Sequence, residues 1–165
     1  LYAKNPKILK PLIIGGNQEG SLRAGTENIP YIAAMGLASE LATKSLKKNI
    51  IHLKSLEILF KQKLQDLFKT LTFNGSQSKK LPGVISVSFP GFSSDILLIK
   101  LDREKIYVSN GSACGSAIVK PSHVLKAIGL DDSTNLSTLR FSFGRSNNFE
   151  EIETLVDVLK YKILK

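Results

Sequence analysis

The sequence has 165 residues, the length of one domain with a short extension, and 42% of them are hydrophobic, as in ordinary globular proteins. No apolar run approaches the roughly 18 residues of a membrane span, so we expect no membrane partner. The net charge is +9, but only 4 of the 23 basic residues are arginines and the lysines are spread out. This pattern excludes a typical nucleic-acid site, and leaves solvated surface lysines or, as the alternative, a docking patch for an acidic partner.

The first residues and the single cysteine indicate whether the chain is part of a longer protein and in which compartment it lies. The sequence starts at Leu1 without an initiator Met and without the layout of a signal peptide, so we expect it to be the inside of a longer chain. Cys114 is the only cysteine, so no internal disulfide can form. A reducing compartment fits this composition, and we expect a cytoplasmic protein.

The predicted elements alternate between helices and strands. Residues 1–28 are rich in glycine and poorly periodic, and we expect them to be extended and exposed. The later elements follow from apolar periodicity: helices at about 30–48 and 54–69, a turn at 74–76, strands at 84–89 and 105–109, a helix from Ser93, a Ser/Gly-rich loop at 109–120, a helix at about 122–128, a strand at 138–143, and a helix that starts with a capping box from Asn148 to Glu151. The alternation of strands and helices predicts an α/β domain. We expect this domain to cover about residues 49–165 and to contain a mostly antiparallel sheet.

The first candidate site is the glycine-rich run at residues 15–28. Its glycines allow a ligand to approach the backbone, and Arg23, Gly25 and Thr26 offer a cation, a bend and a hydroxyl. A helix that begins just downstream adds free N–H groups, which suit a phosphate. The spacing does not match a P-loop, and a plain glycine-rich turn remains the alternative.

The second candidate is Cys114, which lies among glycines and serines in residues 109–117. A structural cysteine normally has apolar neighbours, so this setting favours an accessible thiol that carries a group between partners. A surface cysteine without a role remains the alternative.

The third candidate is Arg140, in the alternating stretch 139–143. Its side chain is predicted to point away from the apolar face, where it is either a clamp for a carboxylate or a surface ion pair. The two histidines are weak signals: we expect His52 to be a surface residue, and His123 to serve packing or capping, with tuning of the Cys114 thiol as the alternative. No Cys/His cluster has the spacing of metal ligands, so we expect no metal.

Taken together, these motifs resemble one family. The run from Gly15 to Asn28 resembles a signature of cysteine desulfurases of the NifS/IscS class, a branch of the pyridoxal-phosphate (PLP)-dependent class-V aminotransferases. Residues 111–114, Gly-Ser-Ala-Cys, resemble the active-site cysteine motif of that class, and residues 120–129 resemble the helix that follows it. Residues 139–145 resemble its Arg-Phe-Ser-x-Gly-Arg strand, and residues 81–91 a strand of its small domain.

The resemblance implies both a fold and an activity. It implies the small C-terminal domain of a fold-type I PLP-dependent transferase at 49–165, a connecting helix at 29–48, and the tail of the large PLP-binding domain at 1–28. The implied reaction converts L-cysteine to L-alanine and leaves the sulfur as a persulfide on Cys114. The implied partners are a second subunit of a homodimer and a sulfur acceptor such as an iron–sulfur scaffold protein.

The resemblance also assigns roles to single residues. Thr26 would bind the PLP phosphate of the partner subunit, with Arg23 and Gly25 shaping that loop, and Arg140 would hold the substrate carboxylate. The Schiff-base lysine of the family would lie upstream of Leu1, so we expect this chain to be a fragment that is inactive alone. The alternatives are a non-enzymatic sulfur-carrier or docking module, and a related enzyme acting on selenocysteine or another amino acid.

Overall fold

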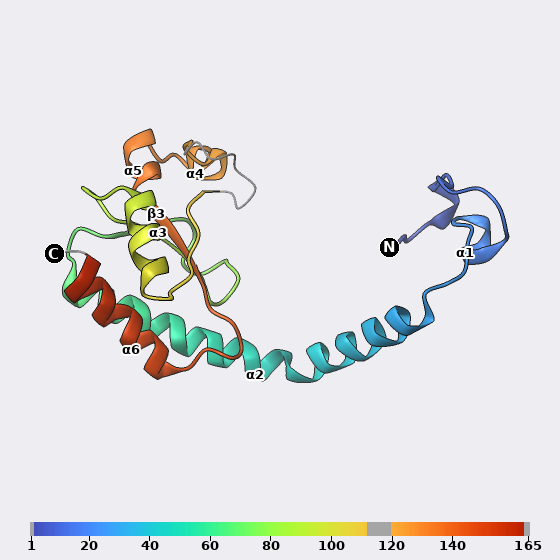
Figure 1. Ribbon diagram of the computed structural model, residues 1–165, viewed down its shortest axis with the longest axis horizontal. Helices are drawn as coiled ribbons and strands as arrows, with labels where there is room; N and C mark the ends of the chain where they lie inside the picture. Colours follow the sequence, from blue (N-terminus) through green and yellow to red (C-terminus); the bar gives the residue numbers. More distant parts are fainter. Residues whose placement is uncertain (1, 112–119, 164–165) are drawn as a thin grey trace. The chain divides into compact units, whose positions relative to one another are not determined.

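A computed structural model describes residues 2–111 and 120–163 of the chain (Figure 1). The chain divides into two compact units, Leu1–Leu46 and Lys47–Lys165. The predicted nucleophile, Cys114, and most of its predicted loop lie outside the described residues.

The first unit contains little regular structure before its helix. A 3₁₀ turn, η1 (Pro6–Ile8), and a short segment, α1 (Gln18–Ser21), interrupt an exposed chain in which, among residues 2–28, only Ala24 is buried. Glu19 and Gly20 have positive φ angles of 50° and 62°, so α1 is a bent turn rather than a regular helix. The exposed character of this segment agrees with the prediction.

Helix α2 (Ile29–Leu67) is longer than the sequence suggested. We predicted two helices with a break between residues 48 and 54, whereas the structure has one continuous helix of 39 residues. The interval contains no glycine or proline to end a helix. Leu53 and His52 belong to the second unit and are partly buried there, so packing within that unit also favours the helical path.

The second unit is built on a three-stranded antiparallel sheet of β1 (Thr72–Phe73), β2 (Val84–Ser88) and β3 (Thr138–Ser142), in the order β1-β2-β3. In the central pair, Ile85 lies opposite Phe141 and Val87 opposite Leu139. These four apolar residues share one face because side chains alternate along each strand. The predicted antiparallel sheet is confirmed.

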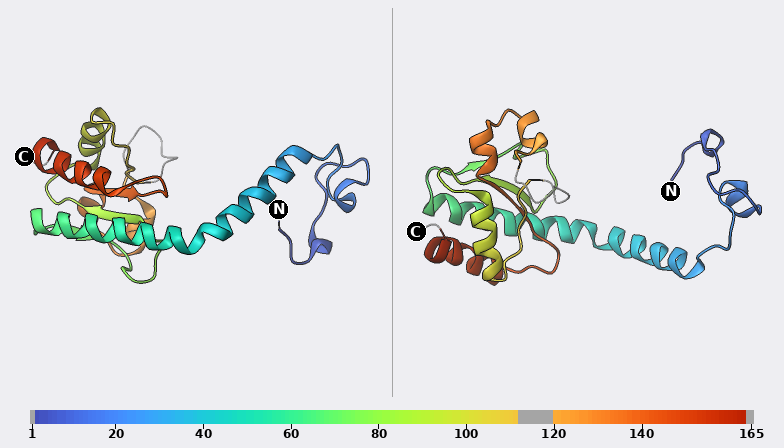
Figure 2. Two further views of the ribbon diagram at one scale, coloured as in Figure 1. Left: turned by 90° about the horizontal axis from the view of Figure 1, so that it is seen from below. Right: turned by 45° about the horizontal axis from the view of Figure 1, so that its top comes forward.

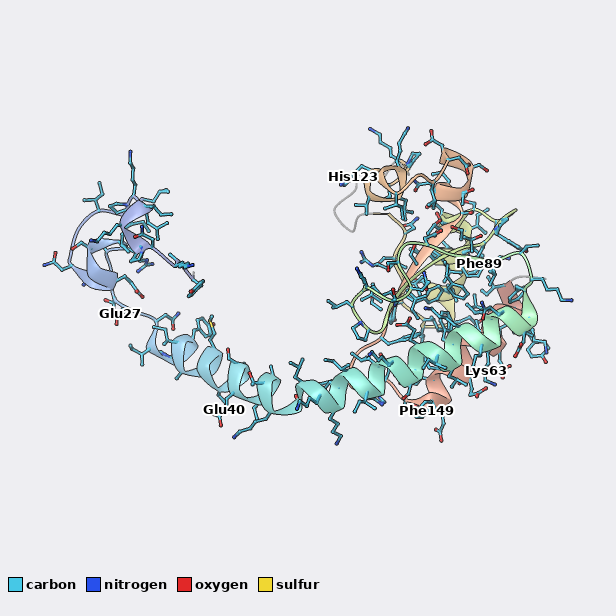
Figure 3. The ribbon with its side chains drawn as sticks, turned by 180° about the vertical axis from the view of Figure 1, so that it is seen from behind. Glu27, Glu40, Lys63, Phe89, His123 and Phe149 are labelled. Atoms are coloured by element: carbon cyan, nitrogen blue, oxygen red, sulfur yellow. The ribbon has the colours of Figure 1, made fainter. Side chains whose placement is uncertain are left out.

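Three helices cover that apolar face and form the core. They are the second half of α2, α3 (Ser94–Arg103) and α6 (Phe149–Val158), which continues into a π-helical turn, η2 (Leu159–Ile163). Figure 2 shows α6 running beside the second half of α2. An ion pair of 2.6 Å joins the two helices, between Lys63 of α2 (labelled in Figure 3) and Glu153 of α6. The helix start at Asn148 is a capping box with Glu151, as predicted.

Two elements near the predicted sites differ from expectation. Residues 105–109 do not form a strand, and only Ser109 makes an isolated antiparallel bridge, to Arg140. After α4 (His123–Ala127), a second short helix, α5 (Asp132–Leu136), precedes β3; the sequence analysis missed it because its five residues are too few to show periodicity. Within the described ranges, no helix combines the length and hydropathy needed to cross a bilayer.

Candidate functional site

Arg140 lies at the middle of β3 on the face opposite the core. Its cross-strand partner is Ser86, and both neighbours in sequence, Leu139 and Phe141, are buried in the core. The guanidinium is exposed and makes no hydrogen bond or ion pair with any other side chain that the structure describes. The backbone therefore holds the arginine rigidly while all its donors remain available, which is the arrangement a carboxylate clamp requires.

Arg140 is also joined through its backbone to the start of the cysteine segment. The N–H of Ser109 donates to the carbonyl of Arg140 at 3.1 Å, and the N–H of Arg140 donates to the carbonyl of Ser109 at 2.7 Å. The next residue, Asn110, donates its side-chain amide to the carboxylate of Asp95 on α3. Ser109 and Asn110, which precede Cys114 in the sequence, are thus fixed against Arg140 and α3, a relationship that the sequence did not reveal.

A directed chain of polar groups occupies the same face beside Arg140. Thr138 donates its hydroxyl to the carbonyl of Thr134 on α5 at 2.7 Å, so at their 2.7 Å contact Ser88 is the donor to Thr138. Ser88 in turn accepts from the amide of Asn74 at 2.8 Å. These bonds satisfy the buried hydroxyls and fix the edge of the face that presents Arg140.

The glycine-rich run lies in the first unit, where Gly25 has a φ of +102° and a side chain there would approach the guanidinium of Arg23 to 3.0 Å. The N–H of Gly25 donates to the side-chain oxygen of Gln18 at 3.3 Å. Arg23 and Thr26 are exposed, and within the described ranges neither side chain has a hydrogen-bond partner. A free cation, a free hydroxyl and a glycine bend without a side chain are chemically suited to a phosphate.

The structure therefore groups the predicted residues in two places. Arg23, Gly25 and Thr26 belong to the first unit, and Arg140 belongs to the second. His123 is exposed at the start of α4 (Figure 3). The expectation of a surface His52 is wrong, because its ring is partly buried, with Nε2 2.8 Å from the carbonyl of Asn147. Among the described side chains, no three His, Cys, Asp or Glu residues gather as metal ligands would.

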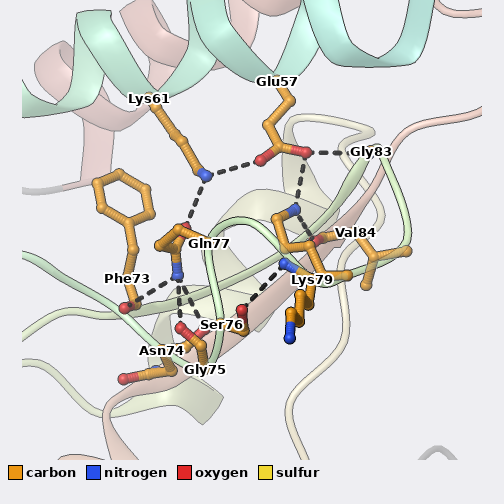
Figure 4. Close-up of polar contacts among 11 residues, drawn as sticks. Glu57, Lys61, Phe73, Asn74, Gly75, Ser76, Gln77, Lys79, Gly83 and Val84 are labelled. Carbon is orange, nitrogen blue, oxygen red and sulfur yellow. Dashed lines mark hydrogen bonds and ion pairs between the residues drawn. The ribbon is translucent and has the colours of Figure 1, made fainter. Parts of the chain in front are cut away.

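A charged cluster around Glu57 was not predicted (Figure 4). Glu57 is only 7% exposed, and its carboxylate binds Lys61 at 2.6 Å, Lys80 at 2.7 Å and the backbone N–H of Gly83 at 3.1 Å. Burial alone raises the pKa of this carboxyl, but the hydrogen bonds from Lys61, Lys80 and Gly83 outweigh it and hold the pKa below its ordinary value. The sequence contained a sign of this buried carboxylate, because Glu57 lies four residues after Leu53 and so falls on the apolar face of its helix.

A pocket of about 390 Å³ lies between residues 104–108, the end of β3 and α6. Tyr107, Ser142, Phe143 and Glu151 are among its lining residues. Arg140 is not among its lining residues, but Ser142, which shares the face of β3 that carries Arg140, is one of them.

Comparisons with known proteins agree with these features. The family described as Aminotransferase class-V matches residues 10–155. "Cysteine desulfurase IscS" of Dictyoglomus turgidum is 38% identical over 165 residues, covering 100% of this chain and 42% of the relative. "Cysteine desulfurase, mitosomal" of Encephalitozoon cuniculi is 39% identical over 163 residues, covering 95% of this chain and 36% of the relative.

Solved structures share the fold. The X-ray structure of a NifS-like protein from Rickettsia africae superposes with a TM-score of 0.77 at 32% identity, covering 91% of this chain and 39% of that one. A second structure, titled "NIFS-LIKE PROTEIN", gives a TM-score of 0.78 at 30% identity. The chain spans about two fifths of the length of the relatives that it matches. The expected fold class is confirmed, and the chain belongs to the class-V aminotransferase family.

Proposed function

We propose that the protein acts as a PLP-dependent cysteine desulfurase, with Cys114 as the residue that receives the sulfur. The observation that carries the proposal is the backbone pairing of Ser109 with Arg140, because it ties the start of the cysteine segment to a free carboxylate-binding side chain. Cys114 follows Ser109 by five residues, so even a fully extended chain keeps their Cα atoms within about 18 Å. The names of the relatives, cysteine desulfurases, support the same chemistry.

The sulfur transfer balances without an external oxidant. The thiolate of Cys114 attacks the sulfur of L-cysteine and forms a new S–S bond. The carbon–sulfur bond of the substrate breaks, its electron pair stays with the carbon, and that carbon takes up a proton. The products are L-alanine and a persulfide on Cys114, and the outer sulfur then passes to an acceptor.

Arg140 supplies orientation in this scheme. Its planar guanidinium holds the substrate carboxylate by two parallel hydrogen bonds, which fixes the sulfur relative to the incoming thiolate. The position on a paired strand makes this clamp stiff, since Leu139 and Phe141 on either side are buried. A carboxylate held in one place lowers the entropic cost of the transfer.

PLP, when bound, supplies the electron sink that makes the carbon–sulfur bond of the substrate cleavable. Of this chain, Thr26 would donate its hydroxyl to the PLP phosphate of the partner subunit in a homodimer, and Arg23 would add a positive charge. Gly25 would let the backbone approach the phosphate. No residue of this chain is assigned as the Schiff-base lysine.

The partners follow from the chemistry. L-cysteine is the substrate, and the persulfide needs a protein acceptor, for which an iron–sulfur scaffold protein is the leading choice. A reducing cytoplasmic location suits a free reactive thiol. The domain division at residues 1–28, 29–48 and 49–165 remains part of this proposal.

The test is product analysis with the protein expressed from its complete open reading frame and supplied with PLP. L-cysteine should yield L-alanine and, with a thiol reductant, an equal amount of sulfide, and mass spectrometry should find 32 Da added to Cys114 (one sulfur atom, about 32 Da). A persulfide loaded from sulfide donors but no alanine from cysteine would favour the sulfur-carrier alternative. Preferential turnover of selenocysteine would favour the related enzyme.

A further inference from the structure

The side chain of Gln18 closes the glycine-rich run on itself. Its amide oxygen accepts from the N–H of Gly25 at 3.3 Å, across seven residues of chain. The orientation of the amide is fixed, because a backbone N–H can only donate and must therefore face the oxygen. Gln18 is also the only partly buried residue among residues 11–21, all the others being exposed. Its side chain therefore lies against the loop.

Two further contacts hold the same loop. The N–H of Ala24 donates to the carbonyl of Ile13 at 3.2 Å. A side chain at Gly15 would lie 3.0 Å from the methyl group of Ala24, the only buried residue among residues 2–28. The loop is thus closed by one backbone bond and one side-chain bond. Because little apolar packing supports this exposed stretch, each bond has a large share in its conformation.

Gly16 leaves free the space that the Gln18 amide occupies. A Cβ atom at residue 16 would lie 2.5 Å from the amide oxygen of Gln18 and 3.1 Å from its nitrogen, which is closer than such atoms can approach. The φ angle of Gly16 is not in the left-handed region, so alanine would meet no backbone strain there. The Gln18 side chain, rather than the backbone, therefore accounts for a glycine at this position.

The bond to Gln18 also sets the position of the groups that suit a phosphate. The missing side chain of Gly25 leaves room for the guanidinium of Arg23, whose Nη1 would lie 3.0 Å from a Cβ atom there. Thr26 follows directly in the sequence. Because Gln18 already occupies the N–H of Gly25, the loop offers an anion the free side chains of Arg23 and Thr26 rather than this N–H.

We propose that Gln18 is a positioning residue for PLP, which locks the bend at Gly25 and so holds the Arg23 guanidinium and the Thr26 hydroxyl ready for the phosphate. This inference rests on the proposed function, in which these two side chains bind that phosphate. A site that is already held in its bound shape avoids the cost of ordering it on binding. Loss of this one neutral hydrogen bond should therefore weaken PLP binding by about two- to tenfold.

Two substitutions break the bond by different routes. Gln18→Ala removes the acceptor, whereas Gly16→Ala keeps Gln18 but adds the Cβ atom that collides with its amide. The double variant should be no worse than Gln18→Ala, because the atoms with which the new methyl group collides are then absent. Ser21→Ala is the matched control, since it removes another bond of 3.3 Å in the same segment, from Ser21 to Asn17, without touching Gly25.

The experiment measures the affinities of PLP and of pyridoxal, which lacks the phosphate, by absorbance titration of the protein expressed from its complete reading frame. Gln18→Ala and Gly16→Ala should bind PLP about two- to tenfold more weakly than wild type, and pyridoxal equally well. Ser21→Ala should match wild type with both compounds. Wild-type PLP affinity in Gln18→Ala, or an equal loss for PLP and pyridoxal, overturns the positioning role.

The wild-type protein distinguishes this failure from a failure of the proposed function. A wild type that binds PLP no more tightly than pyridoxal refutes the phosphate role of the loop itself, and this inference with it. A wild type that prefers PLP, together with a Gln18→Ala variant of the same preference, refutes only the role of Gln18.

Discussion

Glu57 on α2 and Gly83, 26 residues later, are joined by a hydrogen bond of 3.1 Å from the backbone N–H of Gly83 to the buried carboxylate. Gly83 is confined by more than this bond, because its φ is +80° and a side chain there would lie 3.2 Å from the carbonyl of Phe143. The bond fixes the start of β2, the strand that pairs with β3 and Arg140. A residue on α2 therefore fixes the position at which β2 begins.

The first prediction is that Glu57→Gln destabilises the protein by about 1–3 kcal/mol, because it leaves Lys61 and Lys80 facing a neutral amide in a buried setting. Urea unfolding measures this change in free energy. Glu40→Gln is the control, since Glu40 forms an exposed pair with Lys44 one helical turn away and should cost under about 0.5 kcal/mol. Equal losses of free energy in the two variants would show that the buried cluster stabilises the protein no more than an exposed ion pair does.

The second prediction concerns pH and the same carboxyl. The folded-state pKa of Glu57 lies below the ordinary value of 4.5, so the unfolded chain takes up its proton first as the pH falls. The stabilisation is therefore complete above pH 4.5 and is lost as the pH falls through the folded pKa. The free-energy difference between wild type and Glu57→Gln should be constant from pH 7 to about pH 5 and shrink at lower pH. A difference that grows on acidification would contradict the direction of the shift.

Local patterns predicted those parts of the fold that depend on neighbours in sequence. The alternation at 84–89 and 138–143 gave both long strands, and the Asn148–Glu151 spacing gave the start of α6. The exposed position of Arg140 followed from the same alternation. These features need only the period of a strand or the first turn of a helix.

Contacts between distant residues could not be predicted in the same way. The bridge from Ser109 to Arg140 and the hydrogen bond from the N–H of Ser122 to the side chain of Asn135 depend on how α5 turns into β3, and a five-residue helix leaves no periodic trace. The continuity of α2 was missed because the lysine-rich stretch near residue 48 resembles a helix end, while tertiary packing of Leu53 and Leu56 favours continuation.

The third prediction concerns Thr26. If its hydroxyl donates to the PLP phosphate, Thr26→Val should weaken PLP binding about tenfold or more, because a charge-assisted hydrogen bond is lost at nearly constant shape. Thr26→Ser keeps the hydroxyl and should retain affinity. Thr43→Val, on the exposed part of α2, is the control, since that hydroxyl bonds only to the carbonyl of Ser39. PLP titration followed by absorbance measures the affinities, and an unchanged Thr26→Val would remove Thr26 from the phosphate site.

The fourth prediction concerns Arg140. Arg140→Ala should raise KM for L-cysteine more than it alters PLP content, with a loss of roughly 2–4 kcal/mol in substrate binding. Arg140→Lys keeps the charge but not the two parallel donors, so its KM should lie between those of wild type and Arg140→Ala. Arg103→Ala, at the exposed end of α3, is the matched control and should behave as wild type. If steady-state kinetics show the same KM for Arg140→Ala and wild type, the arginine has only a structural role.

The last prediction separates Cys114 as the sulfur acceptor from Cys114 as a surface residue. Cys114→Ala should still bind PLP and still change its visible absorbance when L-cysteine is added, because Arg140 and Thr26 remain. It should form no persulfide and lose alanine formation by a factor on the order of a thousand or more, since removal of a nucleophile leaves only binding and electrostatic effects. Ser116→Ala, two residues later in the sequence, is the control: it removes a neighbouring polar side chain but keeps the thiol, and it should keep the wild-type rate. Persulfide is measured by mass spectrometry of the trapped peptide and alanine by amino-acid analysis. A Cys114→Ala protein that converts cysteine to alanine at the wild-type rate would show that the sulfur leaves without this thiol, and Cys114 would not be the acceptor.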